Sequence, residues 1–182
     1  MDAALVQFHE RGYNGCGVKD ITDAAGVPKG SFYNHFESKE ALALETLRLY
    51  GLSRRAELLA DASRDPLERI RDHFAFLSGE LAARGFTGGC MFGNFANEMG
   101  DQSPALRHAV ETRLGAWSDT VAGLLEEAKA ARRLGRSIDT ERLGRYLINA
   151  WEGATLRARV TKTAEPISDF FAVAIDPLLN GS

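Results

Sequence analysis

Apolar residues spaced three or four positions apart recur from one end of this chain to the other, and this spacing constrains the fold more than any other feature. That period places apolar side chains on one face of a helix, whereas a half-buried strand would alternate apolar and polar residues. The apolar runs stop at glycines and restart at Ser-Pro or Asp-Pro pairs, which are common helix boundaries. We therefore predict an all-α fold of about nine helices.

Boundary signals predict where these helices lie. Three short helices are expected within residues 2–35, and Ser38 can cap a long connector helix that continues toward Leu59. Later helices are expected to begin at Asp65-Pro66, Cys90, Ser103-Pro104, Asp139 and Pro166, and the last two of them to cover about Asp139–Thr161 and Pro166–Leu179.

Composition limits the class of protein. The chain has 182 residues, of which 45% are hydrophobic and 26% charged, so it can form a folded domain or two smaller modules. It lacks both the roughly 18-residue apolar stretch of a membrane span and a basic leader running into an apolar segment, so we expect a cytoplasmic protein. Cys16 and Cys90 are too isolated for a disulfide framework or a metal site, and no cofactor is expected. Because the net charge is −3, any contact with DNA must be local.

The segment from Val18 to Val27 has the pattern of a helix-turn-helix. Ala24 and Ala25 are small enough for two helices to cross closely, Gly26 suits the turn, and an apolar residue follows to close the small core. The pattern is typical of a DNA-binding head, although on its own it has only moderate specificity.

Together with the residues that follow, this segment resembles the signature of the TetR (tetracycline-repressor-like) family. The match extends from Gly12 to Leu42 and includes Pro-Lys-Gly-Ser-Phe-Tyr-Asn-His-Phe at 28–36 and Ser-Lys-Glu-Ala-Leu at 38–42. The resemblance implies an N-terminal three-helix helix-turn-helix head at 1–45, joined to a C-terminal helical ligand-binding and dimerisation bundle at 46–182. It also implies a regulator rather than an enzyme: a homodimeric repressor that leaves a palindromic operator when a small molecule binds.

The helix after the turn is the expected recognition helix for the major groove of double-stranded operator DNA. Lys29 can reach a phosphate or a guanine edge, and Lys39 begins a helix whose N-terminus favours a phosphate. The predicted DNA contacts are Val18, Pro28, Lys29, Gly30, Ser31, Tyr33, Asn34, His35 and Lys39. Two departures from the family leave contacts unassigned: Cys16-Gly17 replaces a Ser or Thr cap, and the basic arm before the first helix has no counterpart.

Residues 89–107 are similar to a core helix of one TetR subgroup, and aromatic side chains elsewhere in the body can line a pocket between helices. The candidate contacts for the unknown small-molecule effector are Phe74, Cys90, Phe92, Phe95, Trp117, Trp151, Glu152 and Thr155. Each of these residues also suits an ordinary packed core, and both interpretations stay open. The resemblance suggests that Cys90 is a thiolate sensor of electrophiles or oxidants, with Arg159 as a candidate cationic partner; the alternative is an inert buried cysteine.

The last two predicted helices are expected to build a two-fold dimer interface, because a palindromic operator calls for two symmetric heads. Their apolar residues cover more of the helix circumference than one contact within the chain needs, and small residues allow a partner helix to approach closely. The predicted interface residues are Ala150, Gly153, Ala154, Ile167, Phe170, Phe171, Ala174, Ile175 and Leu178.

Two other classes of function remain as alternatives. A helical enzyme using His73 or His108 has no metal spacing, phosphate loop or nucleophile elbow in its favour. A partner-binding bundle whose head has lost its DNA affinity is consistent with the acidic head and with Gly17. A steep loss of binding with salt distinguishes a DNA-binding head from that bundle.

Overall fold

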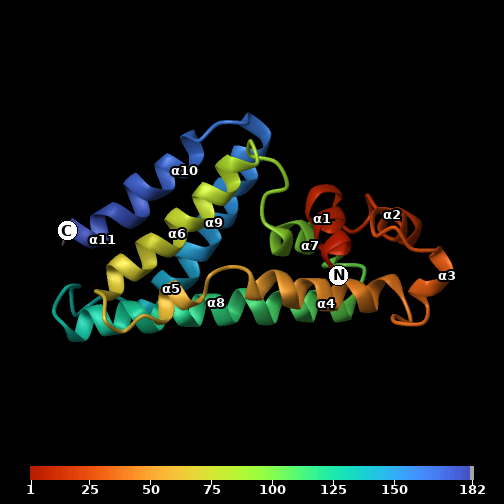
Figure 1. The fold of residues 1–182 in the computed structure, drawn as a ribbon. Coiled ribbons are helices and arrows are strands. Elements are labelled where there is room, and N and C mark those ends of the chain that lie inside the picture. The colour runs from red at the N-terminus through yellow and green to blue at the C-terminus, as the bar shows by residue number, and fades with distance from the viewer. Residues whose placement is uncertain (181–182) are drawn as a thin grey trace. The chain divides into compact units, whose positions relative to one another are not determined.

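The fold is entirely helical, as the apolar spacing predicts: residues 1–180, which the computed structural model describes, contain no strand (Figure 1). Eleven α-helices and one π-helical turn follow one another along this part of the chain. They are α1 (Asp2–Arg11), α2 (Val18–Ala24), α3 (Lys29–Phe32), α4 (Lys39–Leu52), α5 (Glu57–Ala60), α6 (Pro66–Ala83), α7 (Met91–Met99), α8 (Pro104–Ala130), α9 (Thr140–Thr161), α10 (Glu165–Phe170), the π-helical turn (Phe171–Ile175) and α11 (Asp176–Asn180).

Side-chain caps fix several of these helices where the sequence places them. Ser38 Oγ accepts a hydrogen bond from Ala41 N at 3.1 Å at the start of α4. Asp65 caps α6 through the backbone N–H groups of its first turn, and Asp139 accepts from Arg142 N at 3.0 Å at the start of α9. An oxygen acceptor before the first turn satisfies backbone N–H groups that have no partner within the helix.

Two predicted helices differ from the structure. The connector helix ends at Leu52 instead of continuing to Leu59, because Arg55 adopts a left-handed φ of 55° that an α-helix cannot contain. The short helix α5 follows after that break. The last predicted helix is also interrupted, since the π-helical turn separates α10 from α11.

The chain divides into two compact units. The first combines Met1–Ser53 with Gly88–Arg113, and the second combines Arg54–Thr87 with the chain from Leu114 onward; helix α8 contributes residues to both. The functional boundary expected at residue 45 stays a prediction. The packing groups residues differently, because α7 and the start of α8 belong with the head.

Aromatic rings form the centre of the first unit. Phe8 on α1 is fully buried and meets Phe95 on α7 edge to face, with ring centroids 5.5 Å apart. Tyr50 on α4 contacts both Phe92 and His9 in the same way. Such edge-to-face pairs stabilise a core beyond the area they bury, so α7 is tied to the helices of the head.

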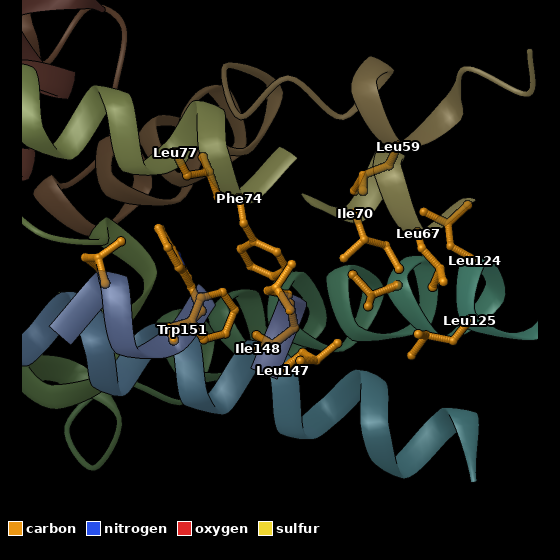
Figure 2. Packing of buried hydrophobic residues seen from close by; sticks show 14 of the residues in the cluster. Leu59, Leu67, Ile70, Phe74, Leu77, Leu124, Leu125, Leu147, Ile148 and Trp151 are labelled. Atoms are coloured by element: carbon orange, nitrogen blue, oxygen red, sulfur yellow. The ribbon is translucent and has the colours of Figure 1, made fainter. Parts of the chain in front are cut away.

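The second unit is built around apolar side chains from α6, α8, α9 and α10, many of which are drawn in Figure 2. Gly144 lets α9 approach α8 closely, because a Cβ atom at this position would lie 2.8 Å from Ser118 O. The fully buried members include Leu67, Ile70, Phe74, Leu125, Leu147, Ile148 and Ile175. Among residues 1–180, no helix is long and apolar enough to cross a membrane.

Candidate nucleic-acid interface and ligand-binding residues

The turn between α2 and α3 has the geometry that the sequence predicts for a helix-turn-helix. Gly26 has a φ of 68°, in the left-handed region that glycine adopts without strain, and Val27 N bonds to Thr22 O at 3.0 Å. Helix α3 is only four residues long, but the hydrogen bonds from His35 N and Phe36 N to Phe32 O continue its winding. The segment from Lys29 to His35 therefore forms a short, defined surface.

Most of the predicted DNA contacts on this surface are exposed. Lys29, Asn34 and His35 are open to solvent, and 59% of Tyr33 is accessible. Phe32 is buried and contacts Phe36, which anchors the segment from behind. A Cβ atom at Gly30 would meet nothing within 4 Å, and Ser31 Oγ donates to Pro28 O at 2.6 Å. The structure thus brings these residues together on one exposed segment.

The remaining predicted contacts flank this segment. Val18 is the first residue of α2, where Asp20 Oδ2 accepts from Gly17 N at 2.7 Å. Gly17 has no side chain to accept from the first turn of the helix, so the contact that a Ser or Thr would make there is missing. Lys39 Nζ lies 4.2 Å from the centroid of the Tyr13 ring, a cation–π contact that holds this lysine near the start of α4. Its phosphate contact stays a prediction.

Cys16 is part of the head's core rather than a reactive group. Its side chain is 1% exposed and its thiol donates to Gly12 O at 3.4 Å. Burial raises its pKa above the usual value, and Lys39 offsets this only partly. A thiol with a raised pKa carries little thiolate at neutral pH.

Three polar contacts join the head to α7 and to the start of α8. Glu98 Oε2 on α7 accepts from Asn14 N at 2.6 Å, in the turn before α2. His9 Nε2 donates to Gly89 O at 2.8 Å, and Ser103 Oγ donates to Glu40 Oε2 at 2.6 Å. Sequence reasoning missed these contacts, because nothing local in the sequence pairs residues that lie 63 to 84 positions apart.

The candidate ligand residues divide between the two units. Cys90 is the N-cap residue of α7 and is partly buried, while Phe92 and Phe95 are buried in the aromatic core of the first unit. These two phenylalanines pack against the head. The sensor hypothesis for Cys90 stays a prediction.

The other candidates lie in the second unit. The Phe74 ring is fully buried, and its centroid lies 5.3 Å from that of Trp151 and 5.9 Å from that of Trp117. Figure 2 shows Phe74 and Trp151 among the packed residues. On α9, Thr155 Oγ1 donates to Glu152 O at 2.9 Å, so its hydroxyl serves the helix backbone. Packed aromatic rings and a satisfied hydroxyl are equally compatible with a core and with the wall of a pocket.

His73 lies on α6 beside Phe74. The sequence indicates it only as a residue of the alternative helical enzyme, whereas the structure shows that its side chain is buried. Its side chain is 2% exposed, and neither ring nitrogen has a hydrogen-bond partner of normal geometry in residues 1–180. Burial lowers the pKa of His73 to about 4, although the nearby backbone of Arg55 acts in the opposite direction. The imidazole is therefore neutral at pH 7.

This lowered pKa predicts a specific pH dependence of stability. The unfolded chain binds more protons than the folded one between the ordinary His pKa of about 6.5 and the folded value, so stability falls as pH is lowered through this window. From pH 7 to pH 4.5 we expect the loss due to His73 to be about 2–3 kcal/mol. Urea denaturation at both pH values should show this loss in the wild type and not in His73→Leu. An equal loss in both proteins contradicts the assignment.

The predicted dimer residues occupy different environments. Ile167, Phe170 and Ile175 are buried in the core of the second unit, and Gly153 is exposed. Ala150, Ala154, Phe171, Ala174 and Leu178 are partly buried against that core. Sequence reasoning missed the large apolar side chains that remain exposed on α9 and the π-helical turn, which are Tyr146, Leu156, Val160 and Val173.

Comparison with known proteins agrees with this architecture. Residues 1–46 match the family described as bacterial regulatory proteins, tetR family, and residues 66–174 match the tetracyclin repressor-like C-terminal domain. The chain is 37% identical over 175 residues to the HTH-type transcriptional repressor DhaR of Mycobacterium sp. (strain GP1), covering 94% of this chain and 86% of DhaR. It is 36% identical over 172 residues to the transcriptional regulator AcuR of Cereibacter sphaeroides, covering 92% and 78%.

Solved structures give the same result. The regulatory protein TetR from Rhodobacter sphaeroides superposes with a TM-score of 0.87 at 35% identity, covering 94% of this chain and 92% of that one. The reduced form of E. coli NemR superposes with a TM-score of 0.83 at 26% identity, with the same coverage. The chain therefore belongs to the TetR family and is a ligand-responsive, DNA-binding transcriptional regulator.

Proposed function

We propose that this protein is a repressor that binds a palindromic operator as a homodimer and is released when a small molecule binds its body. The observation that carries the proposal is the exposed segment from Lys29 to His35, held behind the Gly26 turn by the buried Phe32. Placed in a major groove, this segment offers Lys29 and Tyr33 to phosphates and base edges. We assign DNA binding to residues 1–45, and ligand binding and dimerisation to residues 46–182.

The release mechanism that we propose is a shift between two populations of the dimer. An effector with greater affinity for one spacing of the heads favours that spacing, and two heads that no longer match successive major grooves lose the operator. The contacts of Glu98 with Asn14 and of Ser103 with Glu40 make α7 and the start of α8 parts of the unit that carries the head. A displacement of α7 or α8 therefore carries the head with it.

For the dimer we propose the exposed face of α9 together with α10 and the π-helical turn. At 100° per residue, Tyr146, Gly153 and Val160 fall on one side of α9, opposite Leu147, Trp151 and Ala158, which enter the core. An open groove of about 410 Å³ lies beside this face, between Gly153, Ala154 and Arg157 of α9 and Glu165, Pro166 and Asp169 of α10.

The groove carries both signs of charge, one basic residue and two acidic ones. In a two-fold interface the same patch meets itself, so Arg157 of each protomer can approach an acidic side chain of the other copy. Charge complementarity of this kind supports a second copy of the chain as the occupant of this face.

Alanine substitutions on the recognition segment test the DNA-binding role. Lys29→Ala and Tyr33→Ala should each weaken operator binding by about 1–3 kcal/mol per half-site without lowering stability, because both side chains are exposed. Fluorescence anisotropy with a labelled operator measures the affinity, and thermal unfolding measures the stability. Ala82→Ser, at an exposed position of α6, is the control and should bind as the wild type does. If both alanine variants keep full affinity, the segment does not contact DNA and the partner-binding alternative gains support.

A further inference from the structure

Two buried polar groups in the second unit stand out because the folded chain leaves them unsatisfied. Both ring nitrogens of His73 and the indole Nε1 of Trp117 are buried without a hydrogen-bond partner of normal geometry in the part of the chain that the structure describes, although the backbone of Arg55 lies near His73. The two rings are neighbours, with centroids 5.6 Å apart and planes at 80°. Since the large majority of buried polar atoms in native proteins are hydrogen-bonded, each exception calls for a physical explanation.

Packing alone does not explain this pair. A buried donor or acceptor without a partner destabilises a fold by about 1–3 kcal/mol, and an apolar residue of similar volume would avoid this. His73 and Trp117 surround Phe74 together with Trp151 and Phe170, so the setting is otherwise an apolar aromatic cluster. Polar groups placed in such a setting are what a pocket uses to orient a mostly apolar ligand.

Three arginines of this unit already pair with acidic side chains. Arg54 pairs with Glu80 at 3.2 Å, and Arg55 pairs with Glu57 while its guanidinium lies over the Phe76 ring. Deeper in the unit, the buried Arg69 is held by Glu127 at 2.8 Å and by Leu59 O. A charged ligand that binds here would lose its hydration, and these arginines, which are already paired, would not compensate for that loss.

We propose that His73 and Trp117 are the polar contacts for the effector, and that the effector is an uncharged, mainly apolar molecule bearing a carbonyl or ether oxygen. This inference rests on the proposed function, because it names the class of ligand that the body recognises. Indole Nε1 is a donor only, and a neutral imidazole offers one donor and one acceptor. An oxygen on the ligand accepts from Trp117, and a hydroxyl or a second oxygen on it completes the bonds of His73.

Protonation and exposure are consistent with this role. Burial keeps the imidazole neutral at pH 7, so it attracts neither an anion nor a cation strongly. Trp117 is partly exposed whereas His73 is not, so the indole is the more accessible of the two rings. Trp117 lies on α8, which contributes residues to both compact units. The residue before this helix, Ser103, donates a hydrogen bond to Glu40 of the head. A ligand that displaces the Trp117 indole therefore acts on a helix that starts beside the head.

Four cyclohexane-ring probes that differ in one substituent test the ligand class. Cyclohexanone presents an acceptor, methylcyclohexane has no polar group, cyclohexanecarboxylate is an anion and cyclohexylamine is a cation at pH 7. The indole N–H signal of Trp117, assigned with Trp117→Phe, reports binding by NMR titration. We expect cyclohexanone to bind about tenfold or more tightly than each of the other three, which corresponds to one hydrogen bond of about 1.4 kcal/mol. Equal affinities, tighter binding of a charged probe, or no binding of cyclohexanone overturns the proposal.

Variants separate a ligand contact from a merely structural role. His73→Leu and Trp117→Phe should each reduce the preference for cyclohexanone over methylcyclohexane about fivefold or more, while His73→Leu should raise the unfolding temperature at pH 7. His108→Leu makes the same change at an exposed position of α8 and should alter neither quantity. If His73→Leu retains the full preference, His73 is a packing residue and the proposal fails.

Operator binding by the ligand-free protein is measured in parallel, so that two failures stay distinct. Loss of probe selectivity with intact operator binding overturns this inference and leaves the repressor function standing. Selective probe binding by a protein that binds no operator overturns the proposed function and leaves the ligand site standing.

Discussion

Replacing Val160 with Glu is expected to convert the protein to monomers and to weaken operator binding by about 100-fold or more. Val160 is 78% exposed on the face of α9 that points away from the core, so the charge does not disturb the folded subunit. In a two-fold interface the substitution places two like charges close together in an apolar contact, which opposes association. A single head then loses the gain that comes from binding two half-sites at once.

Sedimentation equilibrium and anisotropy titration with a labelled operator check this result. Leu52→Glu adds the same charge at a side chain that is 63% exposed on α4, and it should remain dimeric and bind DNA. Ile175→Glu is a poor test, because Ile175 is 1% exposed and its substitution would unfold the subunit. A Val160→Glu protein that stays dimeric places the interface on another surface.

Replacing Phe74 with Ala is expected to lower the free energy of unfolding by about 3–5 kcal/mol, which is a large share of the stability of a domain of this size. The Phe74 ring is fully buried and contacts the rings of Trp117, Trp151 and Phe170. Its removal leaves a cavity lined by aromatic side chains that cannot collapse fully.

Chemical denaturation followed by tryptophan fluorescence measures this loss. The control is Phe76→Leu, since Phe76 is only partly buried against the same core and should lose much less stability. A loss below about 1 kcal/mol for Phe74→Ala would mean that the ring is not a core residue. Phe74 would then be assigned to the ligand alone.

Local signals in the sequence were sufficient for most of the fold. Caps at Ser38, Asp65 and Asp139 and the glycine at position 26 act over a few residues, so reading them requires no knowledge of the rest of the chain. The exposed recognition segment follows from the same kind of reasoning, because the turn fixes which side chains lie outward.

Features that depend on packing between distant segments were not predictable. The left-handed backbone at Arg55 after α4 and the π-helical turn after Phe170 are examples, because apolar spacing alone would continue each helix. Periodicity also cannot distinguish a side chain in its own core from one that faces a partner. Apolar periodicity therefore predicts Ile167 and Phe170 as interface residues, although both are buried in the core. The same periodicity applies equally to Val160, which is exposed.

The candidate ligand site shows the same limit. Aromatic residues such as Phe74 and Trp151 were identified by type, but the importance of His73 depends on the absence of a hydrogen-bond partner in the described structure. A sequence does not contain that information, because a histidine on an apolar helix face is usually satisfied by a neighbour. The lone imidazole therefore suggested only a weak catalytic alternative.

The salt dependence of operator binding tests the central claim most directly. Lys29 and Lys39 on two heads make four predicted phosphate contacts, so the logarithm of the association constant should fall against the logarithm of salt concentration with a slope of about −4 or steeper. Genomic fragments selected on the immobilised dimer supply the operator, and Lys29→Ala should reduce the slope by about 2. Binding with a slope near zero, or an unchanged slope in Lys29→Ala, would contradict DNA recognition by this surface.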